Sequence, residues 1–351
     1  MIGIITFDQA VNYGAVLQMY ALQQILEELG IENIVIRYRC EKIIQRHLLK
    51  RKWWNPIGYH LKKKTRDLFT QFINENIHSS PFLSSLSLID SMEVKIDTCI
   101  VGSDQVCNEN LTGYDRAYFL EGLPEHIRRV SYAASMGKYR FTDKKEEQNC
   151  IENLKKFEKI SVREESLCRY LKGTTLGQER EIYVHPDPVL LLDADGWRTR
   201  MGQKVSNEQP YILLYMIGRD ENCIRKAQAL SKETHQKVIW LSDSLRYYSK
   251  ITNKRCCGPQ KFIQTIANSA YVVTNSFHGT AFSLIFQKPF FTTPSKEGKR
   301  EERIADLLDA VEVPETLLGE KPENWQRSVW ETVEENLTSL RKSAINYLNK
   351  M

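Results

Sequence analysis

Apolar residues along the chain occur in short blocks with two alternating spacings. Residues 2–7 form a run rich in β-branched side chains, and residues 16–29 carry apolar side chains at the spacing of an α-helix. Gly30 is placed to end that helix, and residues 31–38 form a second apolar run. This order predicts a strand–helix–strand unit, which implies a parallel sheet.

The same alternation continues in two sets. The first set predicts strands at residues 98–101, 130–133, 160–162 and 182–184, with helices at 143–156 and 164–171. The second set predicts strands at residues 211–216, 237–241, 271–274 and 290–292, with helices at 223–234, 260–268 and 280–286. Residues 193–210 are polar and contain two glycines and a proline, which is typical of a linker.

With 351 residues, the chain exceeds the roughly 100 to 200 residues of one domain. We expect an α/β fold with two doubly wound, Rossmann-like domains that face a cleft, as in the GT-B-like arrangement. The expected N-terminal domain covers residues 1–195, the C-terminal domain 205–320, and a closing helix 321–351.

Composition narrows the function classes. A formal net charge of +5 and the absence of a recognition motif argue against nucleic-acid binding. The eight cysteines include no CxxC pair and are interpreted as reduced thiols. The N-terminus lacks the pattern of a signal peptide, and no apolar run approaches the roughly 20 residues that span a bilayer, so we expect a cytoplasmic protein.

Polar residues follow two of the predicted strands in the N-terminal half of the chain, those at residues 2–7 and 98–101. Asn12 and Gly14 precede the first helix, where backbone N–H groups can bind an anion, although a tight turn that needs Gly14 explains them equally well. Ser103 and Asp104 follow the strand at 98–101. Asp104 can accept a proton from a hydroxyl nucleophile, but capping of the next short helix is the simpler interpretation.

Two further strand ends of this set carry charged residues. Arg163 can bind a carboxylate or phosphate through its guanidinium fork, or form a surface ion pair with Glu164 or Glu165. Asp187 can face the interdomain cleft, although the turn chemistry of its flanking prolines is a simpler explanation.

The sharpest candidate follows the strand at 271–274. Ser276, His278, Gly279 and Thr280 stand between that strand and a helix, so their polar groups are expected to converge at a helix N-terminus suited to phosphate or carboxylate. A single histidine is more often structural, but this position favours a proton donor or anion ligand. Several cations follow the next strand and are candidates for the same anion: Lys296, Lys299, Arg300 and Arg303.

These motifs, in this order, resemble the polysaccharide pyruvyl transferase family over about residues 1 to 310. The segments that carry the resemblance are 6–18, 102–105, 161–164, 187–189 and 276–280. The resemblance implies a GT-B-like fold, phosphoenolpyruvate as donor, and a sugar of a surface polysaccharide or its lipid-linked precursor as acceptor, with a ketal as product. It places the acceptor with the N-terminal domain and the donor with the C-terminal domain.

The resemblance also assigns roles. His278 and Arg163 are expected to bind the donor or act in catalysis, His278 as the acid, with one of the four downstream cations as a further donor contact. Asp104 is a weaker candidate base. Cys107 stands where the family more often has tryptophan. Ser103, Asp187, Asn12, Gly14, Ser276, Gly279, Thr280, Lys299 and Arg300 complete the expected substrate-binding set.

No metal-ligand cluster is apparent in the sequence, so we expect no metal and no cofactor besides the donor substrate. A nucleotide-sugar-dependent GT-B glycosyltransferase is the alternative, because one fold hosts both reactions. A non-catalytic sugar-binding protein is a third interpretation, which the polar strand ends make less attractive.

A basic segment at residues 46–66 contains eight lysines and arginines together with Trp53, Trp54 and Tyr59. It is either a solvated helical insertion in the N-terminal domain or a surface that meets a lipid-linked acceptor at the inner membrane face. We favour the insertion.

Overall fold

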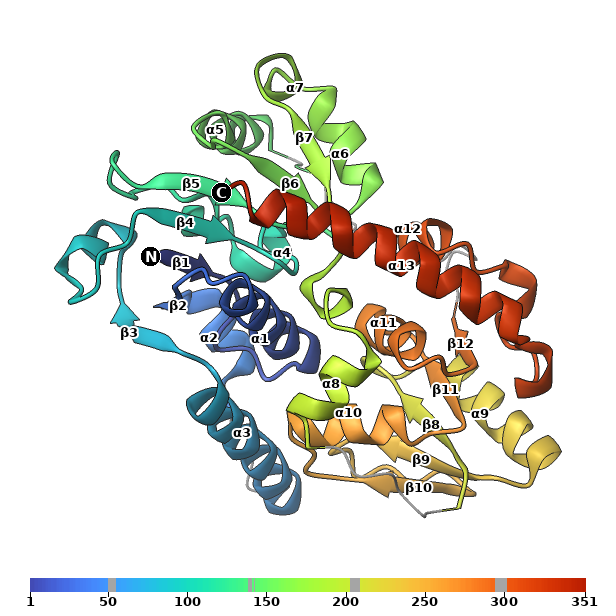
Figure 1. Cartoon of the computed structure of the whole chain (residues 1–351). Helices are drawn as coiled ribbons and strands as arrows, with labels where there is room; N and C mark the ends of the chain where they lie inside the picture. The colour runs from blue at the N-terminus through green and yellow to red at the C-terminus, as the bar shows by residue number, and fades with distance from the viewer. Residues whose placement is uncertain (50–54, 138–140, 142, 203–208, 294–301) are drawn as a thin grey trace. The chain divides into compact units, whose positions relative to one another are not determined.

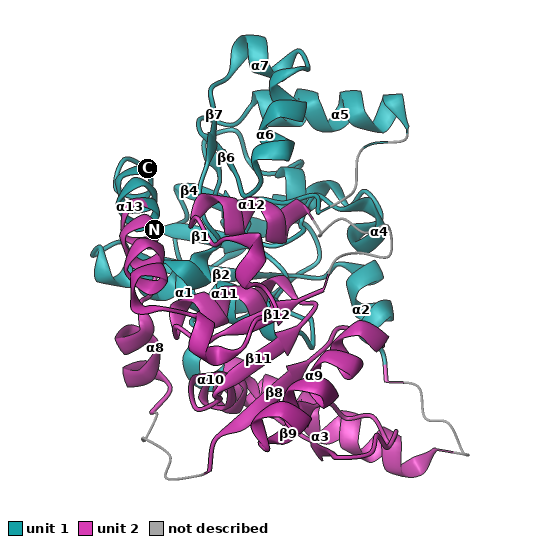
Figure 2. Cartoon of the chain, turned by 90° about the vertical axis from the view of Figure 1, so that its right-hand side faces the viewer, with its two compact units in different colours: residues 1–48, 74–191, 340–351 teal, residues 49–73, 192–339 magenta. Residues whose placement is uncertain are grey.

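The computed structural model describes residues 1–49, 55–137, 141, 143–202, 209–293 and 302–351. The chain forms two compact units (Figure 2). Unit 1 contains residues 1–48, 74–191 and 340–351, and unit 2 contains residues 49–73 and 192–339. Much of the basic segment therefore belongs to unit 2, whereas the sequence placed it in the N-terminal domain.

Unit 1 is built on a parallel five-stranded sheet (Figure 1). Its strands, in spatial order, are β3 (Ser79–Leu83), β2 (Asn33–Tyr38), β1 (Ile2–Ile5), β4 (Thr98–Val101) and β5 (Arg128–Ser131). This order is that of a doubly wound sheet: β2 and β3 are added on one side of β1 and β4 and β5 on the other, so the strand order reverses between β1 and β4. A separate two-stranded parallel sheet joins β6 (Ile160–Val162) and β7 (Ile182–Val184).

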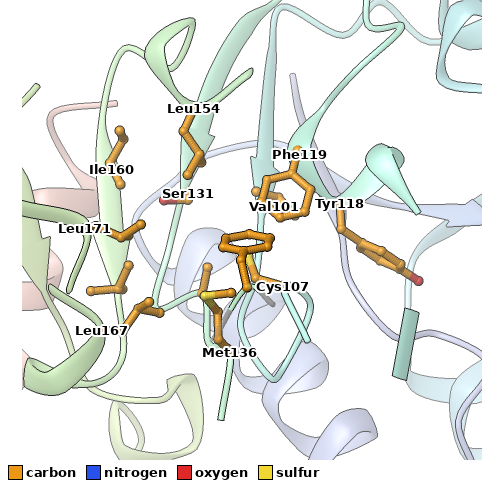
Figure 3. A pocket seen from close by; sticks show the side chains of 13 residues that line it. Val101, Cys107, Tyr118, Phe119, Ser131, Met136, Leu154, Ile160, Leu167 and Leu171 are labelled. Atoms are coloured by element: carbon orange, nitrogen blue, oxygen red, sulfur yellow. The ribbon is translucent and has the colours of Figure 1, made fainter. Parts of the chain in front are cut away.

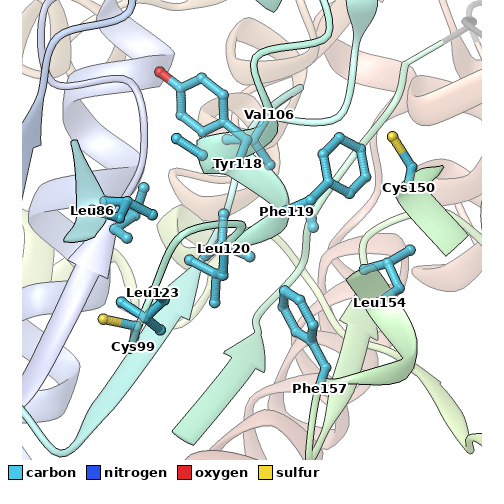
Figure 4. Packing of buried hydrophobic residues seen from close by; sticks show 14 of the residues in the cluster. Leu86, Cys99, Val106, Tyr118, Phe119, Leu120, Leu123, Cys150, Leu154 and Phe157 are labelled. Atoms are coloured by element: carbon cyan, nitrogen blue, oxygen red, sulfur yellow. The ribbon is translucent and has the colours of Figure 1, made fainter. Parts of the chain in front are cut away.

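Helices cover this sheet and bury its apolar side chains. They are α1 (Tyr13–Glu28), α2 (Glu41–His47), α4 (Glu109–Thr112), α5 (Lys144–Lys155), α6 (Glu165–Lys172) and α7 (Leu176–Glu179), with 3-10 helices η1 (Leu86–Ser91), η2 (Arg116–Phe119) and η3 (Pro188–Leu190). Side chains from β4, η2 and α5, such as Cys99, Phe119 and Leu154, meet in one apolar cluster (Figure 4).

Unit 2 repeats the strand order of unit 1. Its parallel sheet runs β10 (Ile251–Lys254), β9 (Lys237–Leu241), β8 (Tyr211–Tyr215), β11 (Tyr271–Thr274) and β12 (Phe290–Thr292). Its helices are α3 (Pro56–Asn76, except its last three residues), α8 (Ala194–Arg200), α9 (Glu221–Thr234), α10 (Pro259–Ala267), α11 (Phe277–Ile285) and α12 (Glu302–Ala310), with η4 (Glu315–Leu317) and η5 (Pro322–Asn324). The predicted fold class is confirmed in that the chain is α/β and each of its two units is built on a doubly wound, Rossmann-like parallel sheet.

The predicted linker is partly wrong. Within residues 193–210, α8 forms a helix that is capped by Asp193, whose Oδ1 accepts the Gly196 N–H at 2.7 Å. Trp197 is fully buried in unit 2, with its ring centroid 5.1 Å from that of Phe282. A tryptophan with that much apolar surface stabilises a helix against the core, which overrides the polar composition of the segment.

The predicted closing helix is α13 (Arg327–Leu348), whose last turns return to unit 1. There the Tyr347 hydroxyl donates to the Ser131 carbonyl at 2.9 Å, and its ring centroid lies 4.5 Å from that of His185. The Nδ1 atom of His185 lies 2.8 Å from the Ser161 hydroxyl, and burial lowers the pKa of His185 to about 4.

Among the described residues, no helix combines the length and apolar character that crossing a membrane requires.

The lowered pKa of His185 makes stability depend on pH. The unfolded chain binds a proton at this histidine below about pH 6.5, whereas the folded chain binds it only below about pH 4. Above about pH 6.5, His185 is neutral in both states and does not lower the free energy of unfolding. As the pH decreases below this value, the unfolded chain binds the proton first, so the free energy of unfolding falls, by about 3 kcal/mol at pH 4. Urea denaturation of wild type and His185→Gln should show that the variant lacks this part of the acid destabilisation.

His60→Gln, on the exposed face of α3, serves as the matched control and should retain the wild-type pH profile. Identical pH profiles for His185→Gln and the wild type would contradict the assignment.

Candidate active-site residues

The strand ends in the middle of the unit 1 sheet are tied together by polar side chains. Gln18 of α1 donates from Nε2 to the Thr6 hydroxyl at 2.9 Å and accepts the Ser103 N–H at 3.1 Å. The Thr6 hydroxyl in turn donates to the Ser103 carbonyl at 3.2 Å. Because β1 and β4 are neighbours (Figure 1), these bonds fix the loop after β4 at the carboxyl edge of the sheet, where such folds bind ligands.

Asp104 does not cap the next helix, so that interpretation is wrong. Asn108 caps α4, whereas Asp104 Oδ1 accepts the adjacent Gln105 N–H at 2.8 Å. Asp104 is buried and has a positive φ of 66°, a conformation that few residues other than glycine adopt and that clusters at functional sites. Its role as a base stays a prediction.

Arg163 lies in a buried ion cluster. Its Nη1 contacts Asp187 Oδ2 at 2.5 Å, and its Nε contacts Glu164 Oε1 at 3.0 Å. Burial opposes the charge of the guanidinium, but these two carboxylates more than offset it, so the pKa of Arg163 is raised above its usual value. The arginine is therefore permanently charged and already faces two carboxylates.

The carboxylates of this cluster also bind the neighbouring strand ends. Asp187 accepts the Ser103 hydroxyl at 3.2 Å and the Val189 N–H at 3.1 Å, which caps η3. Glu164 accepts the Ser135 hydroxyl at 2.6 Å. The interpretation of Arg163 as part of a surface ion pair is wrong, because its pairs with Glu164 and Asp187 are buried. Turn chemistry does explain Asp187, but the sequence did not indicate its ion pair.

Asn12 and Gly14 form the start of α1. Asn12 is the N-cap, and its Oδ1 accepts the Ala15 N–H at 3.2 Å. Gly14 lies in the first turn with helical backbone, so a turn that needs the freedom of glycine does not explain it. A ligand contact at this helix start stays a prediction.

In unit 2, the start of α11 has its own internal bonds. Ser276 is the N-cap, whose hydroxyl oxygen accepts the Gly279 N–H at 3.3 Å, and the Thr280 N–H donates to the Ser276 carbonyl at 3.0 Å. These two amides therefore donate within the helix, which weakens the expectation that they bind an anion. Gly279 has a packing role, because a Cβ there would lie 2.3 Å from Thr274 Oγ1.

His278 lies in the first turn of α11 and is 6% exposed. The Phe277 ring stands edge-on to its imidazole, with centroids 5.1 Å apart, and the Arg303 guanidinium lies 5.7 Å from the centroid of the same Phe277 ring. An imidazole and a guanidinium thus share one aromatic neighbour. Of the four downstream cations, Lys296, Lys299 and Arg300 lie outside the described residues.

A small cavity in unit 1 is apolar and does not belong to either set of polar residues. Its volume is about 20 Å³, and its lining includes Val101, Cys107, Met136 and Leu167 (Figure 3). That volume suits about one water molecule, but an apolar lining offers no hydrogen bonds to hold one. Cys107 therefore contributes to packing, and burial raises the pKa of its thiol above the usual range.

The sequence did not indicate several residues of these clusters. Ser135 has no motif around it. Gln18 and Glu164 belong to segments that carry the family resemblance, but the sequence assigned neither of them its hydrogen bonds to the neighbouring strand ends. No group of three or more His, Cys, Asp or Glu side chains suited to a metal ion is present in the described ranges.

The fold and the polar strand ends define a two-unit α/β protein with polar and charged side chains at the carboxyl edges of its sheets. The model of the polysaccharide pyruvyl transferase family matches residues 12–296. The chain belongs to this family, which confirms the resemblance. The match begins at the cap of α1 and extends past the His278 turn, so it includes both sets of candidate residues.

Comparison with curated proteins found no match. Solved structures with similar chains include the UDP-GlcNAc 2-epimerase from Methanocaldococcus jannaschii, at 14% identity and a TM-score of 0.45, covering 96% of this chain and 99% of that chain. The E. coli heptosyltransferase WaaC is similar at 10% identity and a TM-score of 0.38, covering 88% of this chain and 96% of that one. These identities are too low to bear on activity.

The buried position of Arg163 predicts a large effect on stability. Arg163→Ala removes the cation that Asp187 and Glu164 contact, and we expect the free energy of unfolding to fall by about 3–5 kcal/mol in urea denaturation. Arg327→Ala, which breaks the exposed pair with Glu331 on α13, should change stability little. An unchanged stability for Arg163→Ala would refute the buried-pair account. Activity lost in Arg163→Ala does not by itself identify a donor contact.

Proposed function

We propose that this chain transfers a pyruvyl group from phosphoenolpyruvate to a sugar of a surface polysaccharide or of its lipid-linked precursor, and forms a ketal. The family match over residues 12–296 is the observation that carries the proposal. The polar strand ends of both units add support, because they supply a carboxylate, an imidazole and guanidinium groups to act on the two substrates.

The donor requires positive charge. Phosphoenolpyruvate carries a phosphate and a carboxylate, whose charges are stabilised best by preorganised cations and N–H donors. Arg163 faces two carboxylates, so its charge is already offset. His278 and Arg303, which have the Phe277 ring as a common neighbour, are therefore better candidates than Arg163 to bind the anionic donor.

The proposed reaction has two steps. His278, as imidazolium, gives its proton to the methylene carbon of the donor while a sugar hydroxyl oxygen bonds to C2 and passes its proton to a base, for which Asp104 is the candidate. A second sugar hydroxyl then bonds to C2, and the C2–O bond to phosphate breaks. The products are the ketal and inorganic phosphate, which carries away the second proton.

The direct test is mass spectrometry of candidate acceptors after incubation with the protein and phosphoenolpyruvate. We expect an acceptor to gain the mass of one pyruvyl group and inorganic phosphate to be released. His278→Gln should lower the rate by at least about a hundredfold, because general acid catalysis contributes typically 10²–10⁴-fold. Ser249→Ala, in a loop of unit 2 outside both sets of candidate residues, is the control that should keep the wild-type rate.

Full activity in His278→Gln would remove this residue from the reaction but leave the function standing. The alternative, a nucleotide-sugar glycosyltransferase, has a different donor. Thermal stabilisation by UDP-sugars together with none by phosphoenolpyruvate would favour that alternative and count against pyruvyl transfer.

The outer face of α3 supports a peripheral contact with an anionic membrane, where a lipid-linked acceptor would lie. Lys62, Lys63 and Lys64 are exposed, and within the described residues Lys63 is the one of the three that pairs with a carboxylate, that of Asp67 at 2.8 Å. Ile57 at the start of the helix is 63% exposed. Exposed lysines beside an exposed apolar side chain suit the surface of anionic lipids.

Co-sedimentation with vesicles tests this contact. The protein should bind vesicles that contain phosphatidylserine more strongly than neutral ones, and substitution of Lys62, Lys63 and Lys64 by glutamate should abolish the difference. Lys144→Glu with Lys145→Glu reverses charge on the exposed start of α5 and should retain binding. Equal binding to both kinds of vesicle would support the plain solvated insertion.

A further inference from the structure

A polar pair at the carboxyl ends of β1 and β2 takes no part in the clusters described above. Asp8 follows β1, and Arg37 lies near the end of β2. Arg37 Nε donates to Asp8 Oδ2 at 3.3 Å. The Asp8 side chain is 4% exposed and that of Arg37 is 26% exposed, so a buried carboxylate holds one edge of a half-buried guanidinium.

An aromatic ring holds one face of the same guanidinium. The Cζ atom of Arg37 lies 3.9 Å from the ring centroid of Phe82 on β3, within the range of a cation–π contact. The backbone N–H of Arg37 donates to the Ser80 hydroxyl at 3.1 Å, which fixes the strand beside β3. In the described part of the chain, no hydrogen-bond acceptor contacts the remaining Nη1 and Nη2 atoms of Arg37.

The remaining edge of the guanidinium has a definite chemical preference. Two parallel N–H donors match the two oxygens of a carboxylate or of a phosphate. The guanidinium is already oriented by Asp8 and Phe82, so little side-chain entropy is lost when an anion binds. The pair also lies at the carboxyl edge of the unit 1 sheet, where doubly wound folds bind ligands.

We propose that Arg37, held by Asp8 and Phe82, forms a binding subsite in unit 1 for an anionic group, a carboxylate or a phosphate, of the sugar acceptor. The assignment of this anion to the acceptor rests on the proposed function. The anion-binding property of Arg37 does not rest on it, and can be measured without the transfer reaction.

The charge of Asp8 adjusts the affinity. Burial raises the pKa of Asp8 to about 6, although the charge of Arg37 opposes this. An anion on Arg37 would raise the pKa further, because it places a second negative charge near the carboxylate. Binding therefore takes up a proton, and affinity increases as pH is lowered toward about 6 and levels off below it.

The tyrosine and cysteine side chains described around Asp8 stay neutral in this range. Tyr118 of η2 lies close to Asp8, and burial raises the pKa of Tyr118 well above its usual value. Burial also raises the pKa of Cys40 to about 11 and that of Tyr38 above its usual value. Asp115, the other carboxylate of this region, accepts the Tyr38 hydroxyl at 3.1 Å.

The test is calorimetric titration of the full chain, without phosphoenolpyruvate, with three probes: glucuronate, inorganic phosphate and neutral glucose. We expect binding of at least one anion. For glucuronate, whose charge is constant over this range, the affinity should be about fivefold higher at pH 6 than at pH 8 if anion binding raises the pKa of Asp8 by one unit. Glucuronate preference would indicate a sugar carboxylate, and phosphate preference a phosphate-linked acceptor. Glucose should bind more weakly than the preferred anion.

Matched variants isolate the subsite. Asp8→Asn removes the competing charge, so it should bind the anion more tightly than wild type at pH 8 and lose the pH dependence of glucuronate binding. The double variant Asp8→Asn with Arg37→Gln keeps the pair neutral but lacks the guanidinium N–H donors. It should therefore lose anion binding. Arg39→Ala removes an exposed arginine two residues further on, which pairs with Glu41 at 3.1 Å, and should bind as wild type does.

Three results would overturn the proposal: equal affinity for the anions and for glucose, anion binding that survives in the double variant, or a loss of equal size in Arg39→Ala. If the anions bind as expected but pyruvyl transfer fails with every acceptor, the subsite stands and the proposed function falls.

Discussion

The buried guanidinium of Arg163 is the interaction on which the carboxyl edge of unit 1 depends. Through Asp187 it is linked to Ser103 after β4, and through Glu164 to Ser135 after β5. One cation thus sets the positions of loops that follow separate strands. Charges removed from water at such cost are kept only when each has its partner, so these loops are held as a unit.

The central strands could be predicted from the sequence because they are buried on both faces. β4 and β11 read as continuous apolar runs, and their predicted bounds agree with the structure. The edge strands β3 and β10 were missed, since β3 contains a proline and β10 is mostly polar. An edge strand has one neighbour and needs less apolar surface, so its pattern is weaker.

The candidate residues could be located but their partners could not. The motif positions of Ser103, Arg163 and Asp187 follow from where strands end, which is a property of local sequence. That Arg163 faces Asp187 depends on the register of β6 with β7, and the sequence does not specify it. The same limit applies to Asp8 and Arg37, 29 residues apart, which become neighbours only because β1 pairs with β2.

The distribution of charge gives the two units different chemical abilities. In unit 1 the guanidinium of Arg163 faces two carboxylates, and the negative charge of Asp104 also acts on this guanidinium. Under the proposed function, such an edge is less suited to a donor that carries a phosphate and a carboxylate than to neutral hydroxyl groups that must lose protons. The histidine and arginine around Phe277 in unit 2 have the opposite character. Under the proposed function, this contrast favours binding of the anionic donor by unit 2 and of the acceptor hydroxyl groups by unit 1. The proposed subsite at Arg37 agrees with this division, because it would supply unit 1 with a cation to hold an acidic acceptor.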